Sequence, residues 1–444
     1  MRAGRDLAPL SATETVGKIA GGELSSEQAV TACLERIAAR DPEIRAFVHL
    51  DPEHALAQAR ACDDERRRGR PLGPLHGVPV AIKDIFDTAD FPTENGSPLF
   101  AGRKPERDAT VVAKLRAAGA VILGKTVTTE CAFYHPGPTR NPHDLSRTPG
   151  GSSSGSAAAV TAGMAPVGLG SQTNGSVIRP AAFCGVIGFK PSHGLVSRAG
   201  ALALSRRLDH VGVFARTLAD AALLIDVLAG PDLADPDTRE APQPGLGAAL
   251  RGPAARPRIA FVRTPIWEKA NPATRIAFEA FADRLDLEAL DLPAHFARAW
   301  DALRMIMSAD MARNLGPAVE RGGEGKVSKV LGDFLAEGNA VSPARYEEAV
   351  AEAGLCRSDL ARALTGFDAL LTPATVGVAP PIATTGDPAF CSLWTLAGVP
   401  AVSLPILPGE GGLPLGVQLV AAHGEDARLL RAAQWLLGAT SSTR

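Results

Sequence analysis

Apolar and polar positions alternate along the chain in short blocks, some with helical spacing and some with strand-like spacing, and no block repeats. Ser25 and Gln28 form a capping sequence ahead of apolar residues three and four positions apart, which predicts a helix to about residue 40. A short strand is expected over 46–50, and a second helix over 52–60. Mixed blocks of this kind are typical of an α/β protein.

The segment 78–86 is apolar and β-branched, as expected of a buried strand, yet it contains Lys83. A buried lysine is costly unless it is paired or neutral, so this residue is a candidate for chemistry. Further helix and strand units should complete the sheet. They are a helix that Asp108 caps and that runs to about 118, a strand over 121–123, a helix over 155–163 and a strand over 167–170.

The pattern changes after about residue 230, where Pro, Gly and Ala become frequent and helical spacing then dominates to about 364. We therefore expect one domain, 1–444, with a helical cap or insertion at about 231–365. Short apolar strands near 369–373 and 417–420, with a last helix over 426–437, should return the chain to the core sheet.

Composition excludes several classes of protein. The 444 residues are 45% hydrophobic and 21% charged, which is typical of a globular protein. Lys plus Arg total 46 against 48 for Asp plus Glu, a net charge of −2, so no field of one sign is available to bind nucleic acid or an anionic membrane. The six cysteines are scattered without a CxxC pair, and we interpret them as reduced.

No metal motif occurs in the sequence, and no run of eighteen apolar residues that would span a membrane. The first residues, from Met1 to Asp6, lead into a mixed segment without the apolar core of a secretion signal. We therefore expect a cytoplasmic protein that binds neither nucleic acid nor membrane.

Candidate chemistry gathers in the first half of the chain. A run of glycine and serine, Gly150 to Ser156, lies ahead of a second small turn that ends at Ser176. Serine hydroxyls are nucleophiles only when a base takes their proton, and a desolvated Lys83 is such a base. Each feature also has a simpler interpretation: the serines cap a helix or form a loop, and the lysine pairs with Asp84 or Asp87.

The residues in this half of the chain carry a family resemblance. The stretches 147–160 and 175–191 resemble the signature region of the amidase signature family, and the resemblance extends to 77–84, 139–142, 397–401 and 416–418. It implies a mixed central β-sheet flanked by helices on both faces. Within the family, the sequence Gly-Ser-Val-Ile-Arg-Pro is nearer the malonamidase-like branch.

The resemblance also implies a mechanism, namely hydrolysis of a linear amide through an acyl-enzyme without histidine, metal or cofactor. By position, Ser176 matches the nucleophile, Lys83 matches the base, and Ser152, after a cis peptide bond with Gly151, matches the serine that relays protons between them. Backbone N–H groups would hold the oxyanion. They belong to Thr173, Asn174, Gly175 and Ser176.

The substrate is less well defined by the sequence than the reaction is. The arginine that follows the nucleophile in many members stands one residue later here, as Arg179. A guanidinium at this place would bind a substrate carboxylate, or it would form a structural ion pair. Tyr134 and Ser153 are further candidates for contact with a small amide, and Trp300, Met305 and Met307 for the pocket wall.

Two other functions stay open. The chain resembles the glutamine-hydrolysing component of amidotransferases, which uses the same serines and lysine to release ammonia for its partner subunits. It could also be a scaffold that kept the fold and lost the activity. A homodimer is compatible with the sequence.

Overall fold

The computed structural model describes residues 9–238 and 244–441, and their strands form one mixed sheet. The strand order is β1-β3-β2-β4-β6-β5-β10-β11-β9-β7-β8. Parallel pairs join β2 to β3 and β4, and β7 to β8 and β9, while the other neighbours are antiparallel. The strands are β1 Phe47–Leu50, β2 Pro79–Lys83, β3 Val121–Thr126, β4 Val167–Gln172, β5 Ile187–Lys190, β6 His210–Ala215, β7 Ile259–Val262, β8 Glu288–Leu290, β9 Ala369–Pro373, β10 Ala401–Pro408 and β11 Pro414–Val420.

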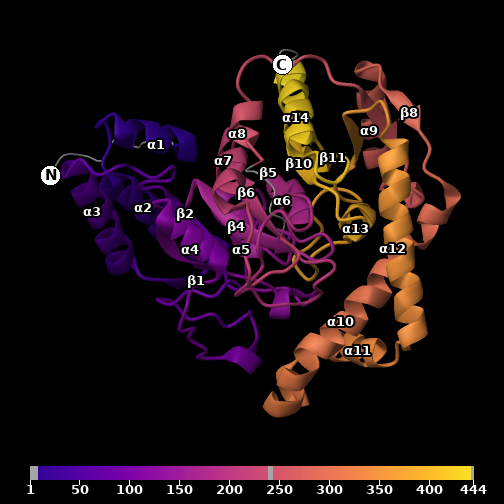
Figure 1. Cartoon of the computed structure of the whole chain (residues 1–444), viewed down its shortest axis with the longest axis horizontal. Helices are drawn as coiled ribbons and strands as arrows, with labels where there is room; N and C mark the ends of the chain where they lie inside the picture. Colours follow the sequence, from indigo (N-terminus) through magenta and orange to yellow (C-terminus); the bar gives the residue numbers. More distant parts are fainter. Residues whose placement is uncertain (1–8, 239–243, 442–444) are drawn as a thin grey trace.

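Helices cover both faces of the sheet (Figure 1). On β6, Phe214 packs into a cluster with residues of α5 and α6, whereas Val211 and Val213 join the main core with residues of α7, as the alternation of side chains along a strand requires. The α-helices are α1 Ala12–Ala20, α2 Ser26–Ile44, α3 Pro52–Arg67, α4 Thr110–Ala117, α5 Ser154–Thr161, α6 Ile178–Cys184, α7 Leu218–Leu228, α8 Leu246–Ala249, α9 Pro272–Arg284, α10 Ala299–Gly322, α11 Lys329–Asn339, α12 Pro343–Ala363, α13 Ala389–Leu396 and α14 Asp426–Ser441.

Most elements expected from the sequence are present, and the Ser25–Gln28 capping box precedes α2. Two local predictions were wrong. Helix α4 begins at Thr110 without a side-chain cap, because the carboxylate of Asp108 instead accepts from the N–H of Ala89 and from Arg116. Strand β2 does not continue to residue 86 but ends at Lys83, where the chain turns and the Lys83 carbonyl accepts from the N–H groups two and three residues later.

The span 231–365 contains more than the expected helices. Helices α10, α11 and α12 pack together within it, but it also supplies β7 and β8, which extend the central sheet beyond β9. Residues 239–243, in the Pro- and Gly-rich part of this span, lie outside the described residues. The strands were missed because each has only three or four residues, too few for periodicity to show.

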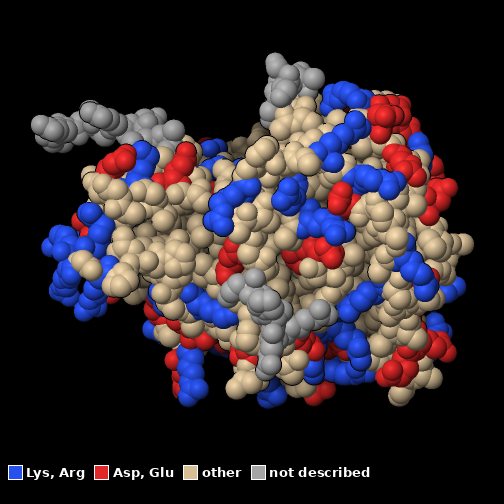
Figure 2. Space-filling view, turned by 45° about the horizontal axis from the view of Figure 1, so that its top comes forward, with Lys and Arg blue, Asp and Glu red and all other residues tan. Residues whose placement is uncertain are grey.

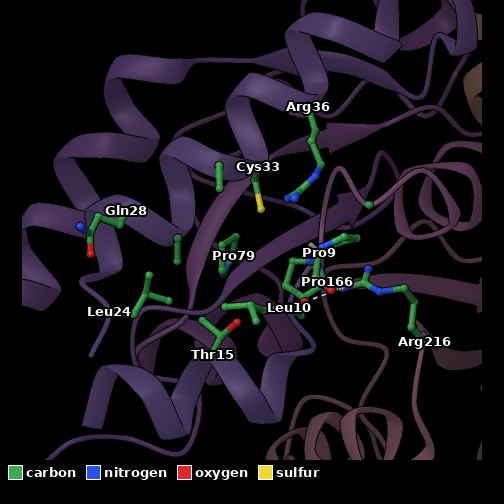
Figure 3. Close-up of a pocket in the computed structure, with 13 residues that line it drawn as sticks. Pro9, Leu10, Thr15, Leu24, Gln28, Cys33, Arg36, Pro79, Pro166 and Arg216 are labelled. Atoms are coloured by element: carbon green, nitrogen blue, oxygen red, sulfur yellow. Dashed lines mark hydrogen bonds between the residues drawn. The ribbon is translucent and has the colours of Figure 1, made fainter. Parts of the chain in front are cut away.

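A small cavity of ≈30 Å³ lies between the N-terminal segment, α2 and the start of β2, and Figure 3 shows Arg216 reaching toward Leu10 beside it. The Arg216 guanidinium donates to the carbonyls of Leu10, Ala165 and Val160. A space of this size holds about one water molecule. We therefore interpret it as a packing gap at which Arg216 ties the N-terminal segment to the core.

The surface agrees with the near-zero net charge. On the face that Figure 2 shows, Lys and Arg are interspersed with Asp and Glu. None of the helices in the described part of the chain is both long and apolar enough to cross a membrane. Residues Met1 to Asp6, on which the expectation about a secretion signal rested, lie outside the described residues.

Candidate active site

The sheet brings Lys83 to the signature region. Strands β2 and β4 are parallel neighbours, with Ile82 opposite Leu169, so their carboxyl ends lie at the same edge of the sheet. Lys83 is the last residue of β2, and Ser171 lies near the end of β4. In sheets of this type, ligands bind beyond the carboxyl ends of parallel strands.

Lys83 is completely buried, and its amine is bonded, among the described residues, only to hydroxyl groups. Its Nζ donates to Ser152 Oγ at 2.7 Å and to Ser171 Oγ at 2.8 Å. Burial lowers the pKa of Lys83 well below its usual value, and the charge of Asp209 opposes this effect only in part. An amine with a lowered pKa is neutral more often near neutral pH, and the neutral amine is the form that accepts a proton.

The simpler interpretation of Lys83, an ion pair with a neighbouring aspartate, was wrong. Asp84 instead pairs with Lys125, with 3.1 Å between Oδ1 and Nζ, and Asp87 pairs with Arg103. Among the described residues, no carboxylate lies within salt-bridge distance of Lys83. Its burial is therefore compensated by hydrogen bonds to hydroxyl groups and, in part, by the charge of Asp209, but not by an ion pair.

The glycine-serine run forms the loop that leads into α5. The Gly151–Ser152 peptide bond is cis, as the family resemblance implies. Ser153 occupies the N-cap position of α5 but makes no capping hydrogen bond, since its hydroxyl lies 3.2 Å from the Ser171 carbonyl and donates to it. Ser154 Oγ donates to the carbonyl of Gly150. Ser153 thus supports the strand that carries Ser171.

Ser176 lies in the turn between β4 and α6 and is 7% exposed. The side chain of Gln172 accepts from the N–H groups of Val177 and Ile178 at 2.9 and 3.0 Å. Within the described residues, the backbone N–H groups of the three preceding residues donate no hydrogen bond, and the Ser176 hydroxyl has no hydrogen-bond partner. Free N–H groups next to a serine hydroxyl are the arrangement that an oxyanion hole requires. They belong to Asn174, Gly175 and Ser176.

The turn is fixed by α13, which is far away in sequence. Asn174 accepts at its side-chain carbonyl from Ser392 at 2.7 Å and at its backbone carbonyl from Thr395 at 2.6 Å. Its amide nitrogen donates to the hydroxyl of Tyr134 at 3.0 Å. The sequence placed Asn174 and Tyr134 near the site but gave no role to Ser392 or Thr395, because no local motif connects them to it.

Asp209 is a further residue that the sequence analysis missed. It accepts from Thr173 Oγ1 at 2.6 Å and from the N–H groups of Leu204 and Ser205. Desolvation raises the pKa of Asp209 to about 6. Asp209 therefore holds the first residue of the turn and places a titratable charge close to Lys83.

In the described part of the chain, Arg179 does not form the structural ion pair considered for it, and its binding of a substrate carboxylate stays a prediction. It is 1% exposed, and its Nη1 and Nη2 donate to the carbonyls of Gly386 and Gly151, each at 2.6 Å. Within the described residues it forms no ion pair and does not line the neighbouring cavity. The Gly151 carbonyl belongs to the peptide bond ahead of Ser152, so Arg179 positions that serine.

A cavity of ≈340 Å³ adjoins the turn. A Cβ added to Gly151 would lie 2.8 Å from Thr385, and one added to Gly175 would lie 2.9 Å from Pro388, and both of these neighbours line the cavity. Side chains around it carry both signs of charge. The lining includes Tyr134, Asn174, Lys269, Trp300, Arg304, Met307, Asp387 and Ser392.

Two of the three expected wall residues lie in this lining. Trp300 and Met307 line the cavity from α10, and the indole N–H of Trp300 donates to the carbonyl of Ala389 at 2.9 Å, which joins α10 to α13. Met305 packs against the core instead. The reason is helical geometry, since residues two positions apart on a helix face different directions.

Comparison with known proteins identifies the family of the chain. The model of the family described as Amidase matches residues 28–430. This chain belongs to the amidase signature family. A curated member of it, the A subunit of the glutamyl-tRNA(Gln) amidotransferase of Salinispora arenicola, is 39% identical, and the match covers 96% of each chain.

Solved structures of amidase relatives share the fold over nearly the whole chain. One comes from a vestigial protein complex connected with an s-triazine catabolic enzyme, with a TM-score of 0.91, 32% identity and coverage of 97% of this chain and 98% of that one. Another is the peptide amidase of Stenotrophomonas maltophilia, with a TM-score of 0.83, 32% identity and coverage of 98% and 97%. These relatives support the family and the fold, but not the malonamidase-like branch in particular.

Proposed function

We propose that this amidase cleaves a carboxamide C–N bond with Ser176 as nucleophile, Ser152 as proton relay and Lys83 as base. The observation that carries the proposal is the 2.7 Å hydrogen bond between Lys83 Nζ and Ser152 Oγ, at a lysine that is buried without a carboxylate. A buried lysine whose pKa is lowered by desolvation is a candidate for catalysis. The intact set of three residues argues against an inactive scaffold.

The reaction has two halves. Ser176 Oγ attacks the carbonyl carbon while its proton passes to Ser152, whose own proton passes to Lys83. The oxyanion forms beside the free N–H groups of the turn. The C–N bond then breaks, the leaving nitrogen takes the proton back through Ser152, and water hydrolyses the ester on Ser176 by the same path. The Ser152–Ser176 hydrogen bond would form when substrate binds, since such contacts are often loose without it.

For the substrate, we favour the carboxamide of glutamine, with ammonia passed to a partner protein. Support comes from the glutamyl-tRNA(Gln) amidotransferase relative that matches 96% of this chain. The cavity also suits a zwitterionic amino acid. Lys269 and Asp387, whose charged atoms lie 3.8 Å apart, and Arg304, which pairs with Glu337, place both signs of charge beside the carboxylate and ammonium groups of such a substrate.

A free-standing amidase is the second candidate. The solved peptide amidase shares the fold and 32% identity, and a cavity of ≈340 Å³ has room for more than one amino acid side chain. Such an enzyme would release its products into solution and would need no partner. The two candidates use the same three residues and differ in substrate and in the fate of ammonia.

The test measures ammonia release by the purified chain from glutamine and from a panel of aliphatic, aryl, carboxylated and urea-like amides. The Ser176→Ala variant is the control for each amide. Turnover of glutamine that rises when amidotransferase partner subunits are added supports the first candidate. Turnover of other amides alone supports the second. Release of ammonia by the Ser176→Ala variant at the wild-type rate would overturn the proposal itself.

A further inference from the structure

A cluster of three metal-binding side chains, His295, Glu352 and Cys356, lies outside the candidate active site, between α12 and the short 3₁₀ helix that runs over Ala294–Arg298. Asp359 lies next to His295. Glu352, Cys356 and Asp359 occupy positions i, i+4 and i+7 of α12, which places them on one face of the helix. His295 comes from the 3₁₀ helix and lies over this face. Figure 1 shows α12 beside α10, on the side of the molecule opposite the N-terminus.

The donor atoms converge. One ligand atom each from His295, Glu352 and Cys356 lies within 4.8 Å of the other two. His295 Nε2 lies 3.1 Å from Asp359 Oδ2, yet this buried nitrogen makes no hydrogen bond, because the geometry is unfavourable. Cys356 is completely buried, and its Sγ lies 3.8 Å from Glu352 Oε1.

Two arginines hold the carboxylates from outside the cluster. Arg298 binds Glu352 through Oε2, at 2.8 Å from Nη2, and Arg362 binds Asp359 through Oδ1. The other oxygen of each carboxylate is left on the side of the imidazole and the thiol. Arginine contacts of this kind orient the ligands of a metal and offset their negative charge.

We propose that His295, Glu352, Cys356 and Asp359 bind a divalent transition metal of the zinc type. One nitrogen, one sulfur and two oxygens make a four-coordinate set that zinc accepts, at about 2.0–2.3 Å from the ion. Ligand atoms around such an ion are roughly 3.5 Å apart, so His295, Glu352 and Cys356 need only small rotations. Asp359, 3.1 Å from His295 Nε2, would turn toward them to complete the set. The thiol releases its proton to solvent when the metal binds. Without a metal, the same residues would form two separate polar pairs.

A metal at this position would link α12 to the segment that leads into α10. The 3₁₀ helix that carries His295 continues directly into α10, which supplies Trp300 and Met307 to the cavity wall. A metal bound to His295 and to α12 would join these two elements by coordinate bonds. The metal would therefore stabilise the wall of the substrate cavity without touching the reacting groups.

The experiment uses the full chain, treated with a chelator and then titrated with Co²⁺, which replaces Zn²⁺ and gives a thiolate-to-cobalt charge-transfer absorption. We expect one equivalent to bind with this absorption, and zinc to displace it. Cys356→Ser should abolish the absorption, and Glu352→Gln should weaken binding at least about 10-fold. Cys62→Ser is the matched control, because this cysteine lies outside the cluster.

A melting curve of each variant shows that it is folded, and zinc should raise the Tm of the wild type but not of Cys356→Ser. Absence of the charge-transfer absorption in the wild type would overturn the proposal. Retention of the absorption in Cys356→Ser, or its loss in Cys62→Ser, would do so as well. None of these measurements depends on amide turnover.

Discussion

Replacement of Lys83 by methionine tests the proposed mechanism most directly. Methionine keeps the length of the side chain and suits the buried surroundings, but it cannot accept a proton. The variant loses the base, and Ser152 loses the bond of 2.7 Å to Nζ. General base catalysis contributes about 10²–10⁴-fold, so kcat should fall by that factor, or about 2.7–5.5 kcal/mol of transition-state stabilisation.

The same variant should change how stability depends on pH. Burial lowers the pKa of Lys83 in the folded state, whereas in the unfolded chain the amine titrates near ~10.4. Between these values the unfolded state binds more protons, so the wild type gains stability as the pH rises and loses it as the pH falls. Methionine has no such dependence. The free energy of unfolding of the variant minus that of the wild type should therefore decrease as the pH rises.

The assay is urea unfolding of both proteins at about pH 7 and at about pH 9.5. Steady-state ammonia release is measured alongside it. The test is the slope of the unfolding free energy against pH. In Lys83→Met, two buried serine hydroxyls also lose the amine as a hydrogen-bond partner, which costs about 1–3 kcal/mol each at any pH. Wild-type turnover near neutral pH in Lys83→Met would refute the role of the base. A free energy of unfolding of the wild type that fell relative to that of the variant as the pH rose would refute the inference that the buried lysine has a lowered pKa.

Three further predictions concern the groups around the lysine. Ser152→Ala should lower kcat by about 10²–10⁴-fold with little change in KM, since Ser152 is not among the residues that line the cavity; a change confined to KM in steady-state kinetics would contradict the relay. Arg179→Met should lower turnover of acidic and neutral amides equally, because the guanidinium binds the Gly151 carbonyl. A KM that increases for carboxylated amides alone would show instead that Arg179 binds the substrate carboxylate. Asp209→Asn should move the acidic limb of the pH profile of kcat/KM to lower pH, because the charge of Asp209 raises the pKa of Lys83; movement to higher pH would exclude this coupling.

Local sequence was sufficient for much of the fold. The Ser25–Gln28 capping box and the apolar strand 79–83 were recognisable because their signals lie within a few residues. Strands β7 and β8 were not, since neither is long enough to show a period, and β7 needs β9 as a partner while β8 needs β7. Asp108 was misjudged because its partners come from other elements.

The sequence by itself determined which chemical groups are available: a lysine in an apolar strand, a glycine-serine run and a serine in a tight turn, in the pattern of the amidase signature family. Only the tertiary structure decided what these groups do to one another. The parallel pairing of β2 with β4 brings Lys83 to Ser171, and the loop ahead of α5 brings Ser152 to the same amine. Asp84 pairs with Lys125 and so forms no ion pair with Lys83. The pKa of a buried amine depends on its surroundings, and those surroundings come from segments far apart in the chain.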